Sequence, residues 1–172
     1  GDAAAEGGMV VQPVVDLRTA RASVLQVIDN LQANGFTPLS ETLYEAGQYW
    51  AGRAVDYGLT SQSAPGVPLP SVPGSRDPLD PGRYKSPIEY QCQRNYTVLL
   101  TDGDPSADNS ADDKIQTLPG YAAAVGASCS GDGPGRCLDE MAKYLNRADL
   151  TALPGQQTSQ VFTIGFGPDV AD

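Results

Sequence analysis

The sequence predicts an α/β fold: a mostly parallel sheet flanked by helices. Residues 96–101 and 160–166 are continuous runs of β-forming residues, typical of strands buried on both faces of a parallel sheet. An amphipathic helix is expected between them, over residues 137–150, with Asp139 and Glu140 in its first turn and Arg147 in its last. A strand, a crossover helix and a second strand indicate parallel pairing. The 172 residues suit one domain.

Two further helices are expected near the start of the chain. Asp16 or Thr19 can cap the first, which should run to about Asn34 and stop at Gly35. Its predicted apolar stripe consists of Val24, Leu25, Ile28 and Leu31.

The second helix is expected over residues 38–53, with Thr37 as N-cap and Pro38 at the first position. Its predicted apolar face consists of Leu39, Leu43, Ala46 and Trp50.

Two other segments have weaker patterns. Residues 9–15 are rich in β-formers but contain Pro13, so an edge strand is the only strand they could form. Residues 58–90 hold seven prolines and show no sustained periodicity, which indicates an inserted surface loop. We expect that insertion to be structureless or to contact a partner.

Composition excludes several classes of function. The formal net charge of -10 opposes binding to nucleic acid or to anionic lipid. The chain has no His, which removes the common nucleophile pairs and the commonest zinc ligand, so we expect no enzyme. It contains no apolar run long enough for a signal peptide or for direct membrane insertion.

Three cysteines leave the redox state open. Cys129 and Cys137 flank a glycine-rich turn and could be joined by a disulfide, with Cys92 left over. The alternative is three reduced and mostly buried thiols.

The strongest functional lead follows the first predicted strand. Asp102 would lie beyond the carboxyl end of that strand, where open α/β sheets bind ligands. Residues 102–113 carry five carboxylates, and such a cluster repels itself unless it is solvated or binds a hard cation such as Mg²⁺, Mn²⁺ or Ca²⁺.

One interpretation of this segment is a calcium loop like that of an EF-hand. It departs from that motif because Ala107 replaces the turn glycine and a strand precedes it. The candidate ligands would be Asp102, Asp104, Ser106, Asp108, Ser110 and Asp113.

A second interpretation pairs two distant motifs, Thr37-Pro38-Leu39 and Thr101-Asp102-Gly103. Together they resemble two of the three metal-site motifs of von Willebrand factor A domains. The resemblance implies a three-layer, Rossmann-like fold, with Thr37 as hydroxyl ligand, Asp102 as acidic ligand and Asp104 as a further candidate. The third motif, Asp-x-Ser-x-Ser, is absent, so we expect a domain incomplete at both ends that holds a cation weakly or not at all.

A more specific likeness covers residues 35–46, 92–103 and 137–145, which resemble the A-type domain of the PilY family of type IV pilus tip and assembly proteins. It implies export to the periplasm, outer membrane surface or pilus tip of a Gram-negative bacterium. It also implies adhesion and pilus biogenesis through a protein partner, either minor pilins or a host surface or matrix protein. The alternative is a structural assembly platform whose metal site is vestigial.

Overall fold

Two parallel strands form the centre of the protein. The computed structural model describes residues 7–31, 36–59 and 71–166. Strand β1 (Asn95–Thr101) pairs in parallel with β2 (Ser159–Gly165), in a register that places Asn95 beside Ser159 and Thr101 beside Gly165. The predicted α/β class and the parallel pairing are therefore confirmed, with the crossover helix α5 (Leu138–Arg147) between the strands in sequence.

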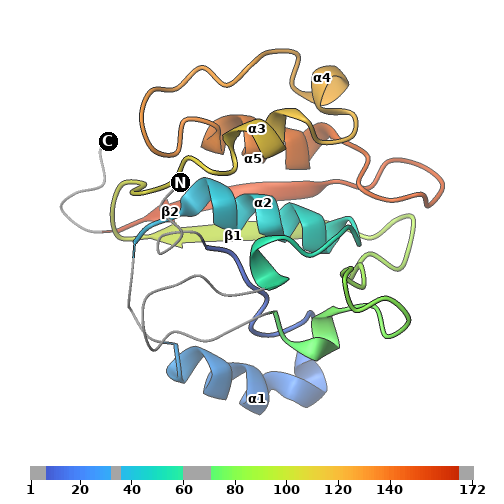
Figure 1. Ribbon diagram of the computed structural model, residues 1–172. Helices are drawn as coiled ribbons and strands as arrows, with labels where there is room; N and C mark the ends of the chain where they lie inside the picture. The colour runs from blue at the N-terminus through green and yellow to red at the C-terminus, as the bar shows by residue number, and fades with distance from the viewer. Residues whose placement is uncertain (1–6, 32–35, 60–70, 167–172) are drawn as a thin grey trace.

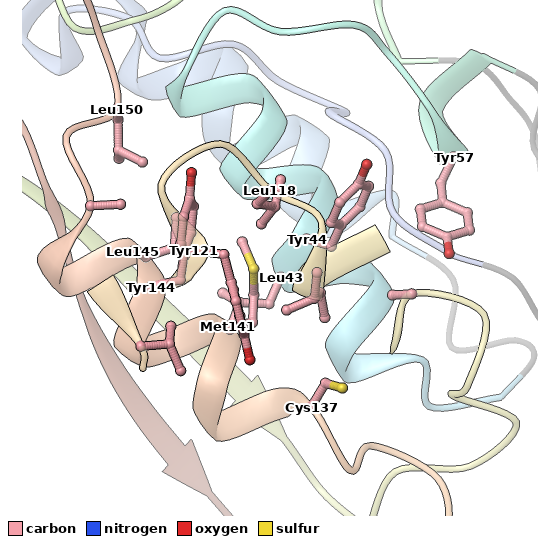
Figure 2. Close-up of a cluster of buried hydrophobic side chains, with 14 of the residues drawn as sticks. Leu43, Tyr44, Tyr57, Leu118, Tyr121, Cys137, Met141, Tyr144, Leu145 and Leu150 are labelled. Atoms are coloured by element: carbon pink, nitrogen blue, oxygen red, sulfur yellow. The ribbon is translucent and has the colours of Figure 1, made fainter. Parts of the chain in front are cut away.

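One face of this sheet is covered by helices. Helix α5 packs against both β2 and helix α2 (Leu39–Trp50) (Figure 1). The main core is built chiefly from side chains of α2, α5 and residues 111–125. Figure 2 shows Met141, Tyr144 and Leu145 of α5 meeting Leu43 and Tyr44 of α2. Each of the three α5 side chains is fully buried, so α5 is the centre of the packing. Its first-turn acids and its last-turn Arg147 occur as predicted.

The opposite face of the sheet is exposed, and here the prediction of strands buried on both faces was wrong. No described element packs over this face. Its side chains alternate along each strand with those that point to the covered face. Its apolar side chains are each 47% to 60% exposed: Tyr96, Val98, Leu100, Phe162, Ile164 and Phe166.

Helix α1 (Leu17–Asp29) begins as predicted, because the Asp16 side chain accepts a hydrogen bond from the Arg18 amide at 2.9 Å. It ends five residues before Asn34; Asn34 and the predicted stop at Gly35 lie outside the described residues. None of its residues is buried, and Figure 1 shows it lying apart from α2 and α5. Its apolar stripe therefore adds little to the core.

Helix α2 is shorter than predicted at both ends. Gly52, with a φ of 59°, adopts the left-handed conformation that commonly terminates helices, so the helix stops at Trp50 and does not reach Arg53. The Trp50 indole nitrogen donates a 2.9 Å hydrogen bond to the Thr97 hydroxyl, which fixes the end of α2 to β1.

The predicted insertion is folded over its described part. The 3-10 turn η1 (Tyr57–Leu59) lies at its start, and η2 (Pro73–Ser75) lies further along. Isolated bridges join Ala54 to Arg83 and Arg76 to Tyr84. Tyr84 is only 2% exposed. The prediction of a structureless loop was wrong for residues 71–90, because prolines obscured a segment that packs on α2. Residues 60–70 lie outside the described part.

Residues 9–15 form no strand, so the condition under which an edge strand was expected is not met. They instead lie along the folded insertion: the Val10 amide donates to the Ser71 hydroxyl, and the Val72 amide donates to the Val10 carbonyl, both at 2.9 Å. The Val14 amide donates to the Tyr49 hydroxyl.

Two short helices that the sequence patterns did not predict lie between β1 and β2 in the sequence: α3 (Asp112–Gln116) and α4 (Tyr121–Ala124). Cys129 and Cys137 are joined in a disulfide that ties the loop after α4 to the start of α5, and Cys92 is an exposed free thiol.

Candidate functional site

The segment before α2 and the acidic loop after β1 are joined by two hydrogen bonds. The Thr37 amide donates to the Ser106 hydroxyl at 3.0 Å, and the Ser106 amide donates to the Thr37 carbonyl at 3.1 Å. Because Ser106 lies four residues after Asp102, this reciprocal pair holds the segment before α2 against the acidic loop after β1. Both segments lie at the carboxyl end of the sheet, where the strand arrows of Figure 1 point.

Asp108 caps helix α2. Its two carboxylate oxygens accept hydrogen bonds from the Ser40 amide at 2.7 Å and the Glu41 amide at 3.1 Å. The predicted Thr37 N-cap was therefore wrong: Pro38 occupies the cap position, and no side chain next to it in sequence makes the capping bond. A carboxylate from the acidic loop reaches two amides at once and gains from the helix dipole, so it replaces the local hydroxyl.

The acidic loop turns sharply just before this cap. Ala107 has a φ of 52°, in the left-handed region that residues with a Cβ rarely adopt. It stands where a calcium loop would have glycine, so the backbone makes the expected turn without the expected residue. The Gly135 amide donates to the Asp108 carbonyl at 2.7 Å and anchors the turn from the other side.

Glu41 fixes the next part of the loop. Its side chain is fully buried; one oxygen accepts from the Ser110 amide and hydroxyl, at 3.2 and 2.8 Å, and the other accepts from the Gly7 amide at 2.9 Å. Ser110 is therefore bound to helix α2, and its hydroxyl is already engaged there.

Asp102 and Asp104 differ from these buried carboxylates because both are exposed to solvent. The turn that presents them is closed by Thr101, whose hydroxyl donates to the Gly103 carbonyl at 2.7 Å. The Thr37 hydroxyl makes no hydrogen bond within the described part of the chain. All three candidate ligands of the A-domain interpretation are therefore available to a ligand.

The six ligands of the calcium-loop alternative are thus divided. Asp108 and Ser110 are engaged by α2, Ser106 pairs with Thr37, and Asp113 lies in helix α3. Over residues 7–31, 36–59 and 71–166, no three acidic or Cys side chains are grouped as a metal-holding cluster. The smaller set of Thr37, Asp102 and Asp104 stays a prediction.

Burial dominates the electrostatics beside the site. It raises the pKa of Glu41, Glu45 and Asp108 above their ordinary values, although hydrogen bonds from backbone amides oppose this in all three. The negative charge of Asp108 adds to the rise in Glu41, and that of Asp112 adds to the rise in Asp108.

These shifts predict an unusual dependence of stability on pH. The folded state binds these protons more tightly than the unfolded chain does, so the stabilisation is fully present below the ordinary pKa values of 4.5 for Glu and 3.8 for Asp and is lost as pH rises through the raised values. We expect urea denaturation to give a larger unfolding free energy at pH 5 than at pH 7. Glu45→Gln should reduce the difference, and a free energy that instead rises steadily toward pH 7 contradicts the assignment.

Sequence patterns did not reveal the roles of Glu41, Glu45 and Asp108. One signal was present: Glu41 and Glu45 are four residues apart on one helix, where like charges repel in water. Such a pair on a helix with apolar neighbours indicates burial with dedicated donors.

No family model, curated protein or solved structure matches this chain. None of the helices within the described ranges is long and apolar enough to cross a membrane.

Proposed function

We propose that this chain is an adhesion module of the von Willebrand factor A type that binds a protein partner through a divalent cation at the carboxyl edge of its sheet. The observation that carries the proposal is the reciprocal hydrogen bonding of Thr37 and Ser106. It holds the Thr-Pro-Leu segment against the acidic loop that follows the Asp-Gly turn, and this supports the proposal. The central apolar part of the exposed sheet face, with Val98 and Phe162, favours a sheet that carries a further layer.

The available oxygen atoms suit a hard cation that leaves part of its coordination shell open to other ligands. Two exposed carboxylates, Asp102 and Asp104, and the unengaged Thr37 hydroxyl offer oxygen atoms only, which suits Mg²⁺ or Mn²⁺. When bound, the cation would supply open coordination positions for a carboxylate of the partner. Because these side chains form no acidic cluster of three in the described structure, weak binding is expected.

Residues around the site position these donors. Asp108 and Glu41 hold the acidic loop against the start of α2, and Ser106 holds the Thr37 backbone. The carboxylates of Asp108 and Glu41 are buried and already hydrogen-bonded. They act on the site by fixing the loop and do not contact the cation.

The proposal predicts that Asp102→Ala weakens Mn²⁺ binding at least about tenfold, since it removes one of two available carboxylates. Isothermal calorimetry of the protein with MnCl₂ measures this. Asp113→Ala is the matched control, because Asp113 is an exposed acid of the same segment that only the calcium-loop alternative uses. Unchanged affinity in Asp102→Ala contradicts the proposal, and a loss in Asp113→Ala supports the calcium loop.

We further propose that the module is exported to the periplasm, outer membrane surface or pilus tip. The Cys129–Cys137 disulfide supports an oxidising compartment. The second candidate function is a structural assembly platform, which is favoured by the internal use of Glu41 and Asp108. Adhesion and pilus assembly that are both normal in an Asp102→Ala strain would favour the platform.

A further inference from the structure

A polar hollow lies at the amino ends of the two strands, opposite the candidate cation site. It has a volume of about 410 Å³, within the range of small-molecule sites. Its wall comes from the segment that enters β1, the segment that enters β2, and Asn146 near the end of α5. In Figure 1 these strand ends lie at the right.

The hollow is rich in hydrogen-bonding side chains that the protein does not use. Four exposed members of its wall make no side-chain hydrogen bond anywhere in the described ranges: Gln91, Arg94, Asn146 and Gln160. Three carry amides, which both donate and accept, and one carries a guanidinium. This density of unused donors and acceptors suits a ligand with many hydroxyl groups.

The floor of the hollow is fixed. Asn95 is only 5% exposed; its side-chain nitrogen donates to the Thr158 carbonyl at 3.0 Å, and its side-chain oxygen accepts from Gln93 at 2.8 Å. The same Gln93 nitrogen also donates to the Pro87 carbonyl. A floor held from three segments is preorganised, which lowers the ordering cost of binding.

The charge of the wall differs from that of the whole protein. The chain carries a net charge of -10, yet the wall includes no Asp or Glu, and Arg94 is its one charged residue. A guanidinium binds a carboxylate in a two-pronged geometry. The half-exposed ring of Tyr96 adds an aromatic surface at the same end, beside the polar Gln160.

We propose that this hollow binds an acidic sugar, a pyranose that carries a carboxylate. Arg94 pairs with the carboxylate, the amides of Gln91 and Asn146 bind the ring hydroxyls, and Tyr96 contacts the apolar face of the ring. The proposal does not depend on the cation site, because the two lie at opposite ends of the strands. A single sugar of this size binds with a Kd on the order of 1 mM.

Cys92 provides a reporter for occupancy. It is exposed, belongs to the wall of the hollow and is the free cysteine, since Cys129 and Cys137 are disulfide-bonded. The experiment measures the rate at which iodoacetamide alkylates Cys92 with and without 20 mM D-glucuronate. We expect alkylation to slow at least about fivefold, and Arg94→Gln to abolish the protection.

Three comparisons make the result decisive. Arg21→Gln, an exposed arginine of α1, should leave protection intact. D-glucose at the same concentration should leave the alkylation rate nearly unchanged, because it lacks the carboxylate. Absence of protection by glucuronate, equal protection by acetate or by glucose, or full protection in Arg94→Gln each overturns the proposal.

Discussion

Glu45→Ala is expected to cost the protein about 3 kcal/mol or more of unfolding free energy, because four donors converge on this buried carboxylate. Its oxygens accept from the amides of Asp56, Tyr57 and Gly58, each at 3.1 Å, and from the Tyr84 hydroxyl. The side chain is 1% exposed, so water cannot replace these bonds without opening the fold. Thermal unfolding should shift downward by about 6 °C or more.

Two controls separate this effect from a general loss of helix α2. Glu45→Gln keeps one acceptor oxygen and should cost clearly less than Glu45→Ala. Glu89→Ala removes an exposed carboxylate and should change stability by less than about 0.5 kcal/mol. A Glu45→Ala protein as stable as the parent would show that the insertion does not depend on this carboxylate.

Asp108→Ala is expected to lower the unfolding free energy by about 2 kcal/mol, since it leaves two amides at the start of α2 without a hydrogen-bond acceptor. It should also weaken Mn²⁺ binding, because the loop that carries Asp102 and Asp104 loses its attachment to the helix. Urea denaturation and calorimetry on the same preparation measure both effects.

The matched variant is Asp132→Ala, an exposed acid in the disulfide loop, which should alter neither quantity. Loss of stability with unchanged Mn²⁺ affinity would mean that Asp108 only caps the helix. The positioning role assigned to it would then be wrong.

The strands and the long helices could be predicted because their signals are local. Residues 96–101 and 160–166 contain runs of β-formers that need no distant partner to be recognised, and both became strands within one residue. Helix α5 likewise carries its own pattern of acids, apolar residues and Arg147.

Distant contacts explain what the sequence patterns missed. Thr37 was predicted to cap α2, but Asp108, about 70 residues later in the chain, does so. The insertion was predicted to lack structure because prolines interrupt every periodicity, yet Glu45 and Tyr84 organise its described part. The spacing of Glu41 and Glu45 singles out the pair, but their long-range donors leave no trace in the sequence, so only the folded chain reveals those donors.

Only part of the candidate site could be predicted, because only part of it has a local signal in the sequence. Asp102 follows a strand with a local signature, so its position at the carboxyl edge could be derived. The binding of Asp108 and Ser110 to α2 could not be predicted, because their partners Ser40 and Glu41 lie far away in the sequence.

Paramagnetic relaxation by Mn²⁺ tests the central claim most directly. In an amide NMR spectrum of the protein, substoichiometric Mn²⁺ should first broaden the signals of Thr37, Asp102, Gly103, Asp104 and Ser106. Signals from residues 91–94, at the other end of the strands, should be unaffected, and Asp102→Ala should remove the selective broadening. Broadening centred on residues 108–113, or spread evenly over the exposed carboxylates, would contradict a cation site built by Thr37 and Asp102.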